Sequence, residues 1–219
     1  MYDSLLSKVI QQKLHPGDVF VDVGANNGFF SILASSIVGN SGKVYSFEPT
    51  KATFARLVRN IEINNFSNII PFNVALGNRK GKETFYDFGK LDGSNSFIGE
   101  KSAIPLTVEM EMLDNILGSI MPNIVKIDVE GFEREVLWGA KRTVLRNDDV
   151  ILIFEYNRSL LRKKGEGYSE VINLLRSNGF KLYAMNDVKE EIETKEIRSH
   201  KDLNPWGCNI YASKHSYNG

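Results

Sequence analysis

The fold is decided by the stretch VFVDVGANNGFFS at residues 19–31. Its first half is an apolar run of the kind that forms a parallel strand buried on both faces. Gly24 permits a turn with positive φ, and Gly28 lets a following helix lie close to a ligand. The amino end of that helix offers backbone N–H groups and a positive dipole end to an anionic group. The stretch predicts a nucleotide-cofactor site, although an ordinary strand-to-helix turn has the same pattern.

The spacing of the two glycines indicates which cofactor fits. Ala25, Asn26 and Asn27 lie between them, so the middle glycine of the dinucleotide pattern G-x-G-x-x-G is missing. That glycine lets a pyrophosphate approach the backbone, and Asn26 hinders such an approach. Because S-adenosylmethionine has no pyrophosphate, the sequence favours it over a nicotinamide dinucleotide. Asp22, just before the turn, offers a carboxylate to backbone or ligand donors.

A second apolar strand, Lys43–Phe47, ends in Glu48 and Pro49. An acid about 20 residues beyond the glycine turn is where a ribose diol is held, and two hydroxyl donors fit two carboxylate oxygens. Glu48 is therefore expected to bind ribose, with a solvated strand-end acid as the alternative. Thr50 is expected to cap a helix at residues 51–64.

Composition limits the class of protein. The 219 residues suit one domain, residues 1–219, that begins with an amphipathic lead-in helix within residues 1–16. Lys plus Arg and Asp plus Glu number 27 each, which argues against a nucleic-acid partner. No apolar run approaches the roughly 20 residues of a membrane span. The single cysteine, Cys208, excludes a disulfide framework, favours a cytoplasmic location and is expected to be a packed residue.

Strands and helices alternate along the chain, which predicts an α/β fold with a doubly wound, mostly parallel sheet of seven strands. The strands are expected at residues 19–23, 43–47, 68–76, 123–129, 150–155, 180–185 and 208–213. Residues 82–111 predict a β-hairpin insertion after the third strand, whose loop at 89–102 either closes over a substrate or is a simple surface loop. Helices are expected at 131–145 and 169–178. The charged residues 189–201 are expected to form a solvated connection.

A second group of ionisable residues lies in IVKIDVEGFE, residues 124–133. Lys126 and Asp128 share one face of the predicted strand, because side chains alternate with a period of two. A lysine in a buried strand is costly to desolvate unless it is paired. Its expected partners are Asp128, Glu155 or Asp22.

Asp128, Glu130 and Glu155 follow the carboxyl ends of strands, where ligands of open α/β sheets gather. They are expected either to bind one divalent cation such as Mg²⁺, or to supply a general base whose pKa neighbouring acids raise. The alternative is a structural ion-pair network. Glu133 is expected to cap the following helix.

Six segments in this order resemble the FkbM family of S-adenosylmethionine-dependent methyltransferases. They are VDVGANNGFFS, SFEPTKATFARLVRNIEINN, NVALGN, MLDNIL, IVKIDVEGFEREVLWGA and ILIFEYN, and they cover most of residues 17–157. The resemblance implies the Rossmann-like class I methyltransferase fold. It also implies cofactor-binding roles for Asp22, Gly24, Ala25, Asn26 and Gly28 (methionine part), Glu48 (ribose), and Asn73, Val74 and Ala75 (adenine). Val74 stands where many methyltransferases carry an acid, so adenine recognition is expected to use backbone groups.

Members of this family are chiefly O-methyltransferases, which implies a hydroxyl acceptor on a sugar, glycan or natural product. Catalysis is expected from Asp128 or Glu130 as base or metal ligand, with Lys126 organising the carboxylates. Three alternatives stay open: methylation of a nitrogen on a peptide or small molecule, a non-catalytic cofactor-binding scaffold, and a nicotinamide oxidoreductase.

Overall fold

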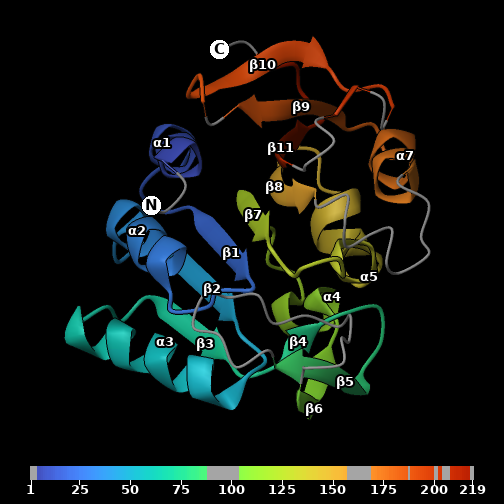
Figure 1. Cartoon of the computed structure of the whole chain (residues 1–219). Coiled ribbons are helices and arrows are strands. Elements are labelled where there is room, and N and C mark those ends of the chain that lie inside the picture. The colour runs from blue at the N-terminus through green and yellow to red at the C-terminus, as the bar shows by residue number, and fades with distance from the viewer. Residues whose placement is uncertain are drawn as a thin grey trace.

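The computed structural model describes residues 4–87, 104–156, 169–186, 188–199, 202–203 and 208–217. Its main feature is an eight-stranded sheet in the order β10-β9-β11-β8-β7-β1-β2-β3 (Figure 1). These strands are β1 (Val19–Val23), β2 (Lys43–Phe47), β3 (Ile69–Phe72), β7 (Ile124–Ile127), β8 (Ile151–Tyr156), β9 (Lys181–Asn186), β10 (Glu191–Glu196) and β11 (Cys208–Ser213).

The centre of the sheet is parallel. β1 pairs with β2 on one side and with β7 on the other, and β2–β3 and β7–β8 are parallel as well. β11 runs antiparallel between β8 and β9. After β1 the chain adds β2 and β3 on one side of β1, and it later adds β7 and β8 on the other side. This reversal creates a topological switch point at the carboxyl ends of β1 and β7.

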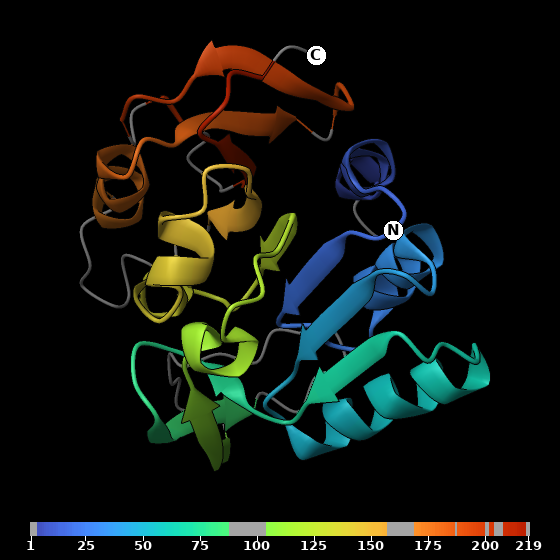
Figure 2. The ribbon, with the colours of Figure 1, turned by 180° about the vertical axis from the view of Figure 1, so that it is seen from behind.

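Helices cover both faces of the sheet, as Figures 1 and 2 show from opposite sides. One face carries α1 (Ser4–Lys13), α2 (Phe29–Val38) and α3 (Lys51–Ile63), and the other carries α4 (Leu113–Leu117), α5 (Glu133–Trp138) and α7 (Ser169–Ser177). Neighbouring strand residues serve opposite layers, since Phe20 packs in the core with α1 and α2 whereas Val21 packs in the core with α5. The predicted doubly wound α/β class is confirmed.

A second, three-stranded sheet has the order β4-β6-β5, with β4 (Ala75–Leu76), β5 (Gly81–Asp87) and β6 (Ile104–Glu111). β5 and β6 are antiparallel, which confirms the hairpin insertion, and its predicted loop lies outside the described residues. The expected third strand at 68–76 divides between the two sheets at Asn73. The Asn73 amide donates to the carbonyls of Glu48 (2.9 Å) and Pro49 (3.0 Å), and so draws the chain toward the end of β2.

Two predictions about the second half of the chain are wrong. Residues 189–201 are not only a solvated connection, because β10 pairs with β9 and adds an eighth strand to the sheet edge. The helix expected at 131–145 is broken into α5 and a π-helical turn, η1 (Lys141–Leu145). At the break, a Cβ on Gly139 would lie 1.9 Å from the carbonyl oxygen of Gly77, so the backbones touch there.

The remaining sequence expectations concern the ends of the fold. α1 is the amphipathic lead-in helix and buries Leu5, Leu6, Val9 and Ile10. Cys208 packs against the larger core cluster, as expected. Within the described residues, none of the helices has the length and apolar character that a membrane span requires.

Candidate active site

The turn after β1 is held by backbone contacts on both sides. The N–H groups of Gly24 and Ala25 donate to the carbonyl of Phe47, at 3.0 and 2.9 Å. Gly24 has φ +76, and a Cβ there would lie 1.9 Å from the carbonyl oxygen of Asp128. The predicted positive φ is confirmed. Only glycine meets both requirements, because it has no Cβ penalty in the left-handed region and lets the loop after β7 approach.

The second glycine has a packing role that the sequence did not reveal. Gly28 has φ +88 at the start of α2, and a Cβ there would lie 2.5 Å from Cδ1 of the buried Leu57 on α3. Between the glycines, Asn26 adopts φ 49, and its N–H donates to Oε2 of Glu48 at 3.2 Å. The turn is thus fixed by the end of β2 as well as by β7.

Glu48 is buried directly after β2, with 7% of its surface exposed. Its Oε1 accepts hydrogen bonds from the N–H (3.0 Å) and the hydroxyl (2.7 Å) of Thr50. Burial raises the pKa of Glu48, against the opposing effect of the bonds from Thr50 and Asn26. A carboxylate has about four acceptor positions, and three are filled. One position on Oε2 therefore remains for a ligand donor, and the ribose contact predicted for Glu48 stays a prediction.

The Thr50 side chain, predicted to cap α3, makes no capping hydrogen bond. Thr50 occupies the predicted N-cap position of α3, but its hydroxyl donates to Glu48 instead of the helix.

The three residues expected to contact adenine differ in what they offer. The Asn73 amide is engaged by the two carbonyls after β2. Val74 is partly buried against the main core, and Ala75 is buried in β4 beside Phe85. Side-chain hydrogen bonding to adenine is therefore left to the Asn73 oxygen, and the adenine contact itself stays a prediction.

Lys126 lies inside the sheet, with 5% of its surface exposed. Its Nζ is 3.2 Å from Oδ1 of Asp22 and 3.5 Å from Oδ2 of Asp128, and it donates to the carbonyl of Gly24 at 3.0 Å. Two of its three expected partners, Asp22 and Asp128, are confirmed. Burial works to lower the pKa of Lys126, but the charges of Asp22 and Asp128 outweigh it, so the pKa is raised.

Asp22 has no exposed surface. Its Oδ2 accepts a hydrogen bond of 2.7 Å from the hydroxyl of Ser31, which in turn accepts one of 2.8 Å from Ser46. Sequence reasoning missed both serines, although each occupies an inward position in an otherwise apolar segment, which is a usable signal. Asp22 can act on a ligand only indirectly, through Lys126 and the turn.

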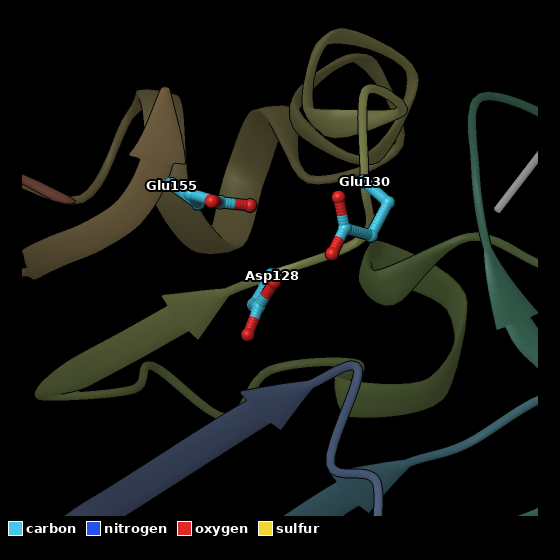
Figure 3. A group of neighbouring side chains, drawn as sticks. All are labelled: Asp128, Glu130 and Glu155. Carbon is cyan, nitrogen blue, oxygen red and sulfur yellow. The ribbon is translucent and has the colours of Figure 1, made fainter. Parts of the chain in front are cut away.

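The acidic residues form one cluster at the carboxyl ends of β7 and β8. Figure 3 shows the carboxylates of Asp128, Glu130 and Glu155 pointing toward a shared space, and one oxygen of each lies within 4.8 Å of the others. Glu130 has φ 52, an uncommon value for a residue with a side chain, and such backbone strain gathers at functional sites. The sequence prediction that these three carboxylates meet is confirmed, and the ligand that they bind stays a prediction.

Glu155 within this cluster and Glu133 beside it have raised pKa values. Burial, and then the charge of Asp128, raises the pKa of Glu155 to about 7. Its Oε2 is buried without a hydrogen-bond partner among the described residues. Burial also raises the pKa of Glu133 to about 7, with smaller effects from Glu155 and Asp128. Glu133 Oε1 accepts from the Gly131 N–H at 3.1 Å, so it stabilises the entry to α5 as expected.

The chain is similar in sequence to known proteins. The model of the methyltransferase FkbM domain matches residues 22–182. "Methyltransferase 1" of Beauveria bassiana is 26% identical over 75% of this chain and 73% of its own length. "Hexuronic acid methyltransferase AglP" of Haloferax volcanii is 30% identical over 66% of this chain and 59% of its own length.

Solved structures share the fold at lower identity. Methyltransferase FkbM from Methylobacillus flagellatus superposes with a TM-score of 0.55 and 14% identity, over 94% of this chain and 50% of that one. Fibrillarin from Aeropyrum pernix, solved with S-adenosyl-L-methionine, gives 0.54 and 15%, over 95% and 73%. The chain thus spans 59% of the Haloferax protein and half of the Methylobacillus chain.

The family model covers well over half of the sequence, and the expected resemblance is confirmed. The chain belongs to the FkbM family and is an S-adenosylmethionine-dependent methyltransferase.

Proposed function

We propose that this protein transfers the methyl group of S-adenosylmethionine to a hydroxyl of a sugar, glycan or natural product. The observation that carries the proposal is the close approach of the glycine turn after β1 to the loop after β7, which bears Asp128 and Glu130. A donor bound at the turn would face the carboxylates across a short gap. The hexuronic acid methyltransferase of Haloferax supports a sugar acceptor.

The proposed donor site follows the carboxyl ends of β1, β2 and β3. The turn at Gly24, Ala25, Asn26 and Gly28 would hold the methionine part. Asp22 would stabilise this turn through Lys126, which donates to the Gly24 carbonyl. Glu48 would bind a ribose hydroxyl at its remaining acceptor position on Oε2. Asn73, Val74 and Ala75 would line the adenine, chiefly through backbone groups.

When bound, S-adenosylmethionine supplies a methyl group whose bond to sulfur breaks as the bond to the acceptor oxygen forms. The protein's part is to align the acceptor, and orientation of this kind can contribute on the order of 7 to 11 kcal/mol. Asp128 or Glu130 would take the hydroxyl proton, which adds about 10²- to 10⁴-fold in rate. Lys126 would hold Asp128 in place through their 3.5 Å contact.

A divalent cation is the alternative use of the same carboxylates. Asp128, Glu130 and Glu155 offer oxygen ligands, which Mg²⁺ and Ca²⁺ prefer, and their spacing within 4.8 Å fits one ion. A cation there would acidify and orient the acceptor hydroxyl, so that less would be asked of a protein base. A nitrogen acceptor or a scaffold without turnover would use the same donor site. We place the protein in the cytoplasm, because its one cysteine favours a reducing compartment.

Acceptor profiling tests the proposal. The protein is incubated with S-adenosylmethionine and a panel of hexuronic acids, neutral sugars and amines, with Mg²⁺ or with a chelator, and products are identified by mass spectrometry. We expect the wild-type protein to form methyl ethers of sugars. The Asp128→Asn variant should form the same products far more slowly. Methylated amines alone would move the reaction to nitrogen, and a requirement for Mg²⁺ would assign the cluster to a cation.

A further inference from the structure

Among the described residues, Lys126 is a buried cation that contacts both the glycine turn and the acidic cluster. It extends from β7, donates to the backbone of the glycine turn, and pairs with Asp22 on β1 and with Asp128 just after β7. Sequence reasoning assigned it only to the carboxylates. Its contact with the donor turn is a separate feature of the structure.

That contact has a specific geometry. The ammonium donates to the carbonyl of Gly24 at 3.0 Å, directly at the turn with φ +76. The N–H of the same peptide, that of Ala25, donates to the carbonyl of Phe47, so the peptide is held by β2 at its N–H and by Lys126 at its carbonyl. Among the described side chains, Lys126 is the one that donates to this carbonyl.

The same ammonium also restrains Asp128, the first acid of the cluster. Asp128, whose side chain is 45% exposed, lies 3.5 Å from it, whereas Asp22 on the opposite side is fully buried. The Asp128 N–H also donates to Val23 at 3.0 Å. A shift of Lys126 would thus move the donor turn and the first acid of the cluster together.

We propose that Lys126 is a positioning residue that sets the glycine turn for S-adenosylmethionine through the Gly24 carbonyl, and so couples donor binding to the placement of Asp128. The inference rests on the proposed function and adds to it a residue on the acceptor strand that determines donor affinity. Lys126 itself touches neither the donor nor the reacting oxygen in this account.

The test compares two variants of buried polar residues. In Lys126→Gln the charge and the full reach to Gly24 are lost, and in Ser35→Ala a buried hydrogen bond to Asn68 is lost that involves neither the turn nor the partners of Lys126. Calorimetry measures the Kd of S-adenosylhomocysteine, and thermal unfolding measures stability. We expect Lys126→Gln to weaken binding about 10- to 100-fold, the range of a hydrogen bond to a charged group, and Ser35→Ala to lower Tm with an unchanged Kd.

Contrary outcomes are distinct. A folded Lys126→Gln protein that binds S-adenosylhomocysteine within twofold of wild type would overturn the inference and leave the proposed function standing. A wild-type protein that does not bind it would overturn both. If Lys126→Gln does not fold, NMR of ¹⁵N-lysine-labelled wild type replaces it. The inference then requires that saturating S-adenosylhomocysteine shifts the slowly exchanging ammonium signal of the buried lysine, and an unshifted signal overturns it.

Discussion

Replacing Gly24 by alanine tests the contact on which the proposed site depends. Two effects follow from the structure. A non-glycine residue in the left-handed region costs roughly 1–2 kcal/mol. In addition, the new Cβ would lie 1.9 Å from the carbonyl oxygen of Asp128, whereas real Cβ contacts essentially never fall under 3.0 Å. The loop after β7 must therefore retreat by about 1 Å, and displacements of that size can cost about 10²-fold in an aligned site.

Gly39 supplies the matched control. It also has positive φ (+62), but a Cβ there meets nothing within 4 Å. Because its ψ of −169 lies in a region essentially confined to glycine, Gly39→Ala should show a backbone penalty alone, of about 1–3 kcal/mol, which for a chain of this size lowers Tm by about 2–12 °C. Gly24→Ala should lower Tm further and weaken S-adenosylhomocysteine binding about 100-fold.

The assay is calorimetric titration of both variants with S-adenosylhomocysteine, alongside thermal unfolding. The reasoning would be refuted if Gly24→Ala bound this ligand as wild type does, or if Gly39→Ala lost affinity to the same degree.

Three further predictions use other parts of the site. Glu48→Gln should raise the Kd of S-adenosylhomocysteine at least about tenfold, because a charged acceptor of the ribose is lost, while the exposed Glu62→Gln should not; equal affinities in calorimetry would remove Glu48 from the donor site. Asp128→Asn should cut turnover about 10²- to 10⁴-fold with an unchanged Kd. The control Asp149→Asn should form product at the wild-type rate. A wild-type rate for Asp128→Asn would exclude Asp128 as the base. The pKa of Glu133 is raised from 4.5 to about 7 in the folded protein, so the folded state binds more protons and the free energy of unfolding should fall as pH rises from about 4.5 to about 7, by on the order of 3 kcal/mol from this group; Glu133→Gln should flatten that slope in urea unfolding at several pH values, and a slope equal to wild type would contradict the assignment.

The parts of the fold that sequence predicted well are those with strong apolar patterns. β1, β2 and β11 have the predicted bounds, because each is a short apolar run buried between helix layers. β10 escaped prediction because its sequence EIETKE buries one side chain, Ile192, and an edge strand needs no more. The division of the third strand at Asn73 depends on a side-chain bond to a distant turn, which no local pattern encodes.

The candidate site divides in the same way. Residue types and order placed Glu48, Asp128, Glu130 and Glu155 at the strand ends, since strand ends follow from the pattern. The sequence did not predict which oxygens of each carboxylate remain free to accept a hydrogen bond from a ligand. The Thr50 bonds that fill Glu48 Oε1, and the serine bond to Asp22 Oδ2, depend on tertiary packing.

A thermal-unfolding titration with S-adenosylmethionine, S-adenosylhomocysteine and NADH tests the central claim most directly. At 100 times its Kd a ligand of the native state stabilises by about 2.7 kcal/mol, which raises Tm by about 5–10 °C for a chain of this length. The account predicts that shift with the first two ligands and none with NADH. Stabilisation by NADH, or by none of the three, would contradict a methyl-donor site at the Gly24 turn.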